Sequence, residues 1–237
     1  MPDGLLVAVV AMAILAGFGL LIRLRLRVVK EAQQLWPRLE AAAAPLGYRP
    51  APPAEADAAV DVLRSSSRFR DSKLELPNLL CRQAGGNRRY LAEYRSTTGT
   101  SDPSIEKGWL FAVRLDDRRL PRFVLFHPPV KLPKLIVAGI EKLATARYPG
   151  FERVDLDAVS PALANGLMCA ESRDQGLRVL TTDVVDVLGR SVGWDLESTG
   201  DWLFADKQTH AKARRGDPST VLAELAEFET IADAFER

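Results

Sequence analysis

The hydrophobic pattern of the chain begins with one long apolar segment. From Gly4 to Ile22, 19 consecutive residues carry no charge and no strongly polar side chain. A helix of this length spans about 28 Å, which matches the hydrocarbon core of a bilayer. Buried helices of soluble proteins usually keep a polar stripe, and this segment has none. The pattern therefore predicts a single transmembrane helix.

Charged residues flank the apolar segment unevenly. Asp3 precedes it, whereas four basic residues follow it: Arg23, Arg25, Arg27 and Lys30. A cleavable secretory signal has the reverse order. The positive-inside rule predicts an N-terminus outside and a C-terminal domain in the cytoplasm, as in a single-pass protein of a bacterial inner membrane. The four basic residues are expected to set this topology and to contact anionic lipid headgroups.

Two small residues in the segment bear on oligomeric state. Ala13 and Gly17 have the small-xxx-small spacing that lets two membrane helices approach closely. The same spacing occurs by chance in many apolar segments. The sequence therefore leaves open a homo-oligomer formed through these two residues.

The rest of the pattern divides the chain into three parts. Residues 1–27 are the anchor with its basic flank, and residues 28–53 are a juxtamembrane helix with a proline-rich linker that cannot continue the helix. Residues 54–237 form the main domain. A short helix at about 54–64 is expected to open it.

Alternating apolar and polar residues then predict an antiparallel sheet. Residues 79–84 and 88–96 form a hairpin in this prediction, because Gly85 and Gly86 supply the positive φ that its turn needs. Residues 109–115 and 123–127 alternate in the same way, with Asp116-Asp117-Arg118 as the turn between them. We expect an antiparallel meander over residues 79–127.

The stretch from Thr97 to Gly108 is polar and interrupts this meander as its longest connection. Loops beside a scaffold carry binding residues more often than the scaffold does. The candidate partner-contacting residues are therefore Thr97, Thr98, Asp102, Glu106 and Lys107.

Helical periodicity returns in the second half of the domain. Residues 131–147 are expected to cover the sheet, and Ser160-Pro161, Thr182-Asp183 and Asp217-Pro218 open further helices. In the last helix, apolar residues recur at spacings of three and four, and four acidic residues are expected to face away: Glu224, Glu227, Glu229 and Asp233. Residues 194–197 and 202–205 predict a second hairpin. Strand pairs and helices without a βαβ rhythm indicate an α+β domain, a meander plus a hairpin covered by helices.

Composition limits the classes of function. The chain has 237 residues, 47% hydrophobic and 27% charged, with a net charge of +1. A single apolar segment followed by ordinary soluble composition rules out a polytopic transporter or channel pore formed by one chain. The chain also lacks the positive excess of a nucleic-acid-binding protein. Two cysteines agree with a reducing compartment.

Candidate chemistry is sparse. The two histidines and two cysteines are far apart in sequence, so no metal site is expected, and no phosphate-binding glycine loop or G-x-S-x-G motif is present. We expect no cofactor. The alternative to a binding protein is a membrane-tethered hydrolase that uses His127 or Cys169.

Several segments resemble bacterial membrane-anchored proteins with a cytoplasmic domain of unknown function: LAEYRSTTG, WLFAVRLD, LPRFVLFHP, MCAESRDQGLRVLTTDVVDVLG and ESTGDWLFA. The resemblance covers most of residues 75–235 and implies a cytoplasmic domain on one or two membrane helices. It supplies no catalytic residue. The leading hypothesis is a non-enzymatic membrane protein whose domain binds an unidentified protein partner and contacts anionic lipid.

Overall fold

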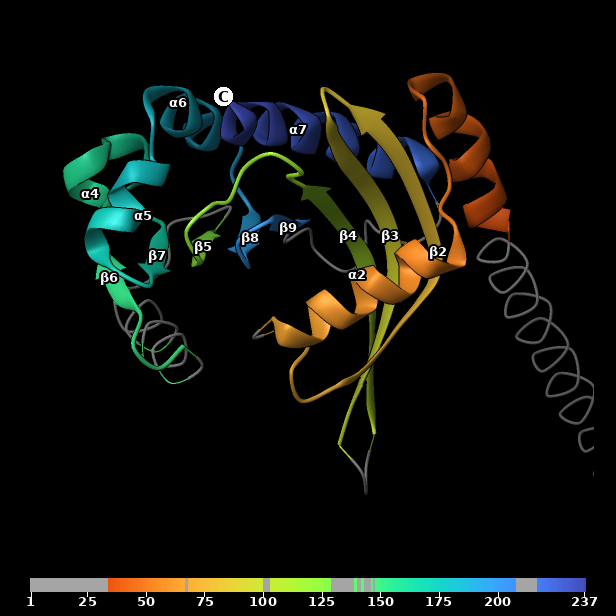
Figure 1. Cartoon of the computed structure of the whole chain (residues 1–237), viewed down its shortest axis with the longest axis horizontal. Helices are drawn as coiled ribbons and strands as arrows, with labels where there is room; N and C mark the ends of the chain where they lie inside the picture. Colours follow the sequence, from red (N-terminus) through yellow and green to blue (C-terminus); the bar gives the residue numbers. More distant parts are fainter. Residues whose placement is uncertain are drawn as a thin grey trace, which may run out of the picture.

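The computed structural model describes residues 34–66, 68–99, 103–128, 139, 142, 146, 148–207 and 217–237 (Figure 1). Several predictions lie outside these residues: the apolar segment with Ala13 and Gly17, the basic residues Arg23, Arg25, Arg27 and Lys30, Asp102, and most of the helix expected at 131–147. Among the described helices, none combines the length and the hydropathy needed to cross a bilayer.

The described strands form one nine-stranded sheet in the order β1-β2-β3-β4-β9-β8-β5-β7-β6. They are β1 (Arg49–Pro50), β2 (Lys73–Ala84), β3 (Asn87–Thr98), β4 (Ser104–Arg114), β5 (Phe123–His127), β6 (Glu152–Val154), β7 (Leu167–Ala170), β8 (Trp194–Ser198) and β9 (Trp202–Lys207). The helices are α2 (Pro53–Ser65), α4 (Leu156–Val159), α5 (Arg173–Val179), α6 (Thr182–Arg190) and α7 (Pro218–Glu236), and residues 34–43 are also helical. Every pairing of these strands is antiparallel, which confirms the α+β class.

The hairpin of β2 and β3 follows the prediction. Gly85 and Gly86 have φ angles of 58° and 92°, which side chains with a Cβ rarely adopt. The turn places Ala84 opposite Asn87. The predicted hairpin of β8 and β9 is confirmed as well, with Ser198 opposite Leu203.

The predicted meander is correct for β2, β3 and β4 but wrong for β5. Strand β4 pairs with β9, and β5 pairs with β8, so the later hairpin lies between them. Residues 115–122 form a connection rather than a hairpin turn. The backbone N–H groups of Leu115 and Leu120 donate to the carbonyls of Asp201 and Gly200, each at 2.8 Å, and this fixes the connection across the end of β8 and β9.

The predicted loop from Thr97 to Gly108 is mostly strand. Strand β3 continues to Thr98 and β4 starts at Ser104, and these two residues are directly opposite. The side chain of Ile105 is exposed, at 58% of its surface. The ends of β3 and β4 extend beyond the helices that cover the sheet (Figure 1). Neither face of β4 is buried there, so the sequence does not show the alternation of apolar and polar residues that is typical of a strand.

Helices cover the two faces of the sheet to different extents. On one face, a row of apolar residues crosses the sheet from Leu91 through Phe111, Ala205, Leu196 and Leu125 to Met168. Helix α7 packs on this face, with Phe228 5.6 Å from Phe111 and Phe235 5.8 Å from Phe123 between ring centroids. Helix α2 lies on the other face (Figure 1). It covers a second core, in which Tyr90 and Trp202 stack with their ring centroids 5.1 Å apart.

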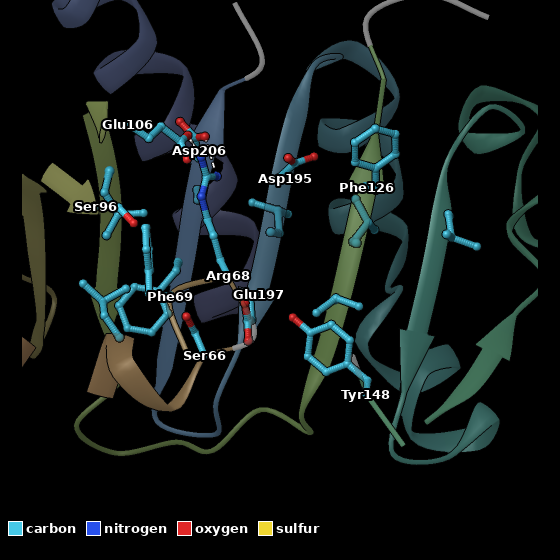
Figure 2. Close-up of a pocket in the computed structure, with 18 of the residues that line it drawn as sticks. Ser66, Arg68, Phe69, Ser96, Glu106, Phe126, Tyr148, Asp195, Glu197 and Asp206 are labelled. Carbon is cyan, nitrogen blue, oxygen red and sulfur yellow. Dashed lines mark hydrogen bonds and ion pairs between the residues drawn. The ribbon is translucent and has the colours of Figure 1, made fainter. Parts of the chain in front are cut away.

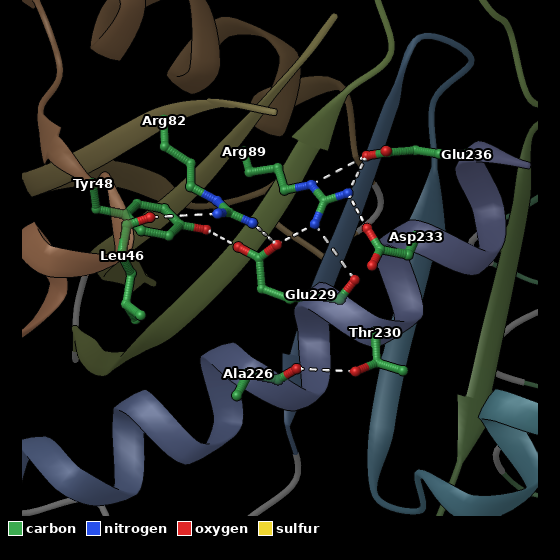
Figure 3. A network of polar contacts seen from close by, with 9 residues as sticks. All are labelled: Leu46, Tyr48, Arg82, Arg89, Ala226, Glu229, Thr230, Asp233 and Glu236. Atoms are coloured by element: carbon green, nitrogen blue, oxygen red, sulfur yellow. Dashed lines mark hydrogen bonds and ion pairs between the residues drawn. The ribbon is translucent and has the colours of Figure 1, made fainter. Parts of the chain in front are cut away.

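Five of the six apolar positions predicted for α7 are buried and the sixth, Leu222, is half-buried, but two of its acidic residues were predicted wrongly. Glu224 is 4% exposed, and Glu229 faces arginines of the sheet. Arg82 and Arg89 are on the same sheet face as α7, and both donate to Glu229 (Figure 3). A carboxylate can lie against the sheet here because these guanidinium groups compensate its charge.

Candidate functional site

A pocket of about 580 Å³ lies on the sheet face opposite α7. Its described walls come from the end of α2, the turn after it, β3, β4, β9, β8, β5 and β7 (Figure 2). This volume is in the range of pockets that bind small molecules or side chains of a partner.

The pocket lies where the cover of the sheet changes. Strand β9 is buried on both faces as far as Asp206, whereas β8 and β5 alternate between buried and half-buried residues. The buried residues of β8 and β5 face α7. The half-buried ones, Asp195, Glu197, Val124 and Phe126, line the pocket.

Cross-strand register places acidic and apolar side chains next to each other. In one row Phe126 is opposite Asp195, which is opposite Asp206. In the next row Val124 is opposite Glu197, which is opposite Phe204. Side chains in directly opposed positions have Cβ atoms about 5 Å apart, so each carboxylate has an apolar neighbour.

Arg68 forms the positively charged wall. Its guanidinium is 2.5 Å from an Asp206 carboxylate oxygen and donates to Glu106 at 3.0 Å and to the Tyr94 hydroxyl at 2.8 Å. It also lies over the rings of Phe69 and Tyr94, at 5.5 and 5.4 Å from their centroids. Burial alone would lower the pKa of Arg68. The charge of Asp206, followed by Tyr94 and Glu106, outweighs this effect and raises the pKa above its usual value, so the guanidinium stays protonated.

Tyr94 completes this cluster. Its hydroxyl accepts from Arg68 and donates to Glu106, the latter at 2.8 Å. Burial raises the pKa of Tyr94, and nearby carboxylates raise it as well, so the hydroxyl remains a donor at neutral pH. Arg68 is therefore held in one position by three polar groups and two rings.

The described lining is negatively charged. It contains Glu106, Asp195, Glu197 and Asp206 against the single guanidinium of Arg68, a formal charge of −3 from four acidic groups and one basic group.

Ser66 adds a polar group at the end of α2. It is 2% exposed, and its backbone N–H donates to the Leu63 carbonyl at 3.0 Å. Its side-chain hydroxyl lines the pocket and has no hydrogen-bond partner in the described structure. Buried hydroxyls usually have a partner, so this one can accept from or donate to a bound group.

The structure brings some of the predicted site residues to this pocket. Thr98 and Glu106 line it, whereas the described lining contains neither Thr97 nor Lys107. Sequence reasoning did not select Arg68, Tyr148, Asp195 or Glu197. The signal for the last two was the alternation of Trp194-Asp195-Leu196-Glu197, which places two acids on one face of a strand.

His127 and Cys169 lie elsewhere. They are 2% and 0% exposed, and the described lining of the pocket includes neither. Burial lowers the pKa of His127, while backbone groups of Ser191 and Leu188 act in the opposite direction. A hydrolase would need one of these residues in a cleft beside a nucleophile or carboxylate, and the pocket does not supply that arrangement.

The described residues also contain no group of three or more His, Cys, Asp or Glu side chains placed to hold a metal ion. Chemically, the pocket can cover an aliphatic or aromatic group with Val124, Phe126 and Phe204. No protein-family model, curated protein or solved structure matches the chain, so its function has to be inferred from its own residues.

Proposed function

We propose that this chain is a membrane-tethered protein-interaction module, and that its α+β domain binds a protein partner at the pocket beside β8 and β5. One observation carries the proposal. Strand β7, β9 as far as Asp206 and β4 from Gly108 to Val113 are buried on both faces, but the half-buried side chains of β8 and β5 line a pocket instead of a core. A half-covered apolar surface with polar neighbours is typical of an interaction site.

The position of the pocket favours a protein as the partner over a small molecule. The end of β3 at residues 95–98 pairs with the start of β4 at residues 104–107 to form the β3–β4 arm. Thr98 and Glu106 are exposed residues of this arm, and both also line the pocket. A partner that enters the pocket would therefore contact the arm as well.

Site-specific photo-crosslinking tests the interaction. A photoreactive residue replaces Thr98 in the full chain, expressed in its native membrane, and a matched variant carries it at Asp157, an exposed residue of α4 outside the described lining. We expect a discrete protein adduct from position 98 only. The adduct should disappear when Val124→Trp fills the pocket. The same adducts from both positions, or an adduct that survives Val124→Trp, would contradict the proposal.

The membrane tether is the second part of the proposal. It rests on the apolar residues 4–22 and on Arg23, Arg25, Arg27 and Lys30, which are proposed to hold the domain on the cytoplasmic side and to contact anionic lipid. Replacing all four basic residues with Ser should produce mixed or inverted orientation of a C-terminal topology reporter. Unchanged orientation would show that these residues do not set the topology.

A further inference from the structure

We propose that the pocket binds a tyrosine or tryptophan side chain of the partner protein, with its ring on the apolar lining and its O–H or N–H group hydrogen-bonded to the Ser66 hydroxyl. This inference rests on the proposed function and specifies which kind of residue of the partner enters the pocket.

The lining of the pocket is mainly apolar. Apolar and aromatic side chains reach it from the turn after α2 and from β4, β5 and β9, among them Phe69, Leu110, Val124, Phe126 and Phe204. Figure 2 shows Phe69 on the side of β3 and Phe126 on the side of β5. Aromatic rings attract one another in offset-stacked and edge-to-face arrangements. A guest ring therefore has aromatic neighbours on opposite sides of the pocket.

Ser66 supplies a polar contact within this apolar lining. Of the described lining residues, it alone has a buried side-chain polar atom without a hydrogen-bond partner. The residue is 2% exposed and lies at the end of α2, where its hydroxyl lines the pocket. Buried hydroxyls normally have a partner, and a serine hydroxyl can accept from an O–H or N–H group. This position therefore points to a ligand with a donor group.

The charged groups of the wall do not select the ligand, because they already interact within the chain. Arg68 pairs with Asp206 and donates to Glu106. Asp195 and Glu197 have interactions of their own as well. A charged ligand would compete with these contacts, whereas an uncharged ligand leaves them in place.

Tyrosine and tryptophan meet both requirements of the pocket. Each has a large ring that covers apolar surface and one polar group that needs a partner when it is buried. An aliphatic side chain, or phenylalanine, would leave the Ser66 hydroxyl without a partner. Serine or asparagine would pair with the hydroxyl but would leave the apolar lining uncovered.

The chain itself does not supply this side chain. It has four tryptophans and four tyrosines, and all eight belong to the described residues. Six of them are buried, Trp36 stacks on Trp109 with ring centroids 6.0 Å apart, and Tyr148 is part of the lining. A second copy of the folded chain has the same residues engaged. The side chain therefore comes from a different protein.

The test uses two probes that differ by one hydroxyl, N-acetyl-tyrosinamide and N-acetyl-phenylalaninamide. Their binding to the full chain in phosphatidylcholine nanodiscs is measured by saturation-transfer NMR, with empty nanodiscs as the blank. We expect saturable binding of both probes and a dissociation constant about threefold lower for the tyrosine probe, because only its hydroxyl can pair with Ser66. N-acetyl-leucinamide should bind more weakly than either aromatic probe.

Variants of the chain assign the difference between the probes to Ser66. Ser66→Ala breaks no described hydrogen bond, so the fold is retained and the two probes should bind equally. Ser65→Ala is the matched control, because Ser65 is exposed and donates to the Val62 carbonyl instead. In this control the threefold difference should remain. Val124→Trp, which fills the pocket, should abolish binding of both probes.

The crosslinked partner provides a second measurement. The adduct from position 98 is digested, and the partner peptide in it is identified by mass spectrometry. We expect a tyrosine or tryptophan in or next to this peptide, and its replacement by alanine in the partner should abolish the adduct. Ser66→Ala should lower the yield of the adduct by about threefold, whereas Ser65→Ala should leave it unchanged.

The outcomes separate this inference from the proposed function. Equal binding of the two probes to the unmodified chain, or a threefold difference that survives Ser66→Ala, would overturn the inference. If the adduct forms but the partner has no tyrosine or tryptophan at the contact, the proposed function holds and the aromatic residue is wrong. If both probes bind as expected but position 98 gives no adduct, the pocket belongs to a free aromatic molecule, and both the protein partner and this inference fail.

Discussion

Arg89 of β3 and Glu229 of α7, 140 residues apart in the chain, form an ion pair between the sheet and the C-terminal helix (Figure 3). Only 3% of the Arg89 side chain is exposed, and it also pairs with Asp233 at 2.5 Å and Glu236 at 2.8 Å. Glu229 in turn accepts from Arg82 and from the Tyr48 hydroxyl. One carboxylate thus joins β2, β3 and the segment before β1 to α7.

Loss of Arg89 should destabilise the domain strongly. Arg89→Met leaves three carboxylates near apolar surface without their common partner, and we expect a fall of about 3 kcal/mol in the free energy of unfolding by urea. Arg64→Ala is the control, because Arg64 and Asp61 are 55% and 76% exposed in their ion pair and should contribute less than about 0.5 kcal/mol. Equal effects of the two substitutions would refute the role of the buried network.

The contributions of Tyr48 and Glu229 to stability are expected to be coupled, because the Tyr48 hydroxyl donates to the Glu229 carboxylate. Burial raises the pKa of Tyr48 above its usual value, and the charge of Glu229 raises it further, so the hydroxyl remains a donor through neutral and moderately alkaline pH. Tyr48→Phe should cost about 1 to 2 kcal/mol in the free energy of unfolding. In a double-mutant cycle with Glu229→Gln, a coupling energy near zero would contradict this contact.

His127 should make stability depend on pH. Burial holds its pKa in the folded protein below the value of 6.5 for an exposed histidine, so the unfolded chain binds more protons in this range. Stability from this residue is complete above about pH 6.5 and is lost as the pH falls toward the folded-state pKa. We expect the decrease in unfolding free energy between pH 7.5 and 5.5 to be smaller in His127→Gln. An identical decrease in both proteins would exclude this residue as the cause.

Gly176 is required by packing. It lies in α5, and a Cβ there would be 2.5 Å from Val154 Cγ2 and 3.0 Å from Ala170 Cβ. Both neighbours are short or branched and belong to strands, so Gly176→Ala should lower stability by about 1 to 3 kcal/mol despite the better helix propensity of alanine.

Gly139→Ala is the matched control, since Gly139 is helical and a Cβ added there would meet no described atom within 4 Å outside its own stretch of helix. There the same substitution should be neutral or raise the thermal midpoint. A stabilising effect at Gly176 would mean that α5 can move away from β6 and β7 at little cost.

Local patterns explain which parts of the fold could be predicted. Gly85 and Gly86 specify a hairpin turn within a few residues, and the apolar spacing of Val221, Leu225 and Phe228 specifies a buried helix face. The pairing of Phe111 with Ala205 has no such local signal, because it depends on which distant strand fits beside β4. For this reason the sequence pattern predicted β5 next to β4, whereas the structure places β9 there.

The pocket was harder to predict for the same reason. Asp195 and Glu197 could be assigned to one strand face, but only the pairing of β8 with β5 and β9 shows that this face meets Phe126 and Phe204. The contact of Arg68 with Asp206 joins a turn after α2 to a strand near the C-terminus. Glu106 was selected as part of a loop, and it lines the pocket as part of a strand.

The central position of β8 and β9 has a consequence for biosynthesis. Among the described strands, this hairpin alone connects β4 to β5, yet it ends at Lys207. Chains emerge from the ribosome N-terminus first, so the inner edge of β5 has no described strand partner until β8 is complete at Ser198, and the inner edge of β4 has none until β9 is complete at Lys207. A nascent or truncated chain that stops before Trp194 therefore presents two open strand edges, which are templates for aggregation. The two halves of the sheet are therefore joined late in synthesis. Before that point, the open strand edges are the surfaces that a chaperone would bind.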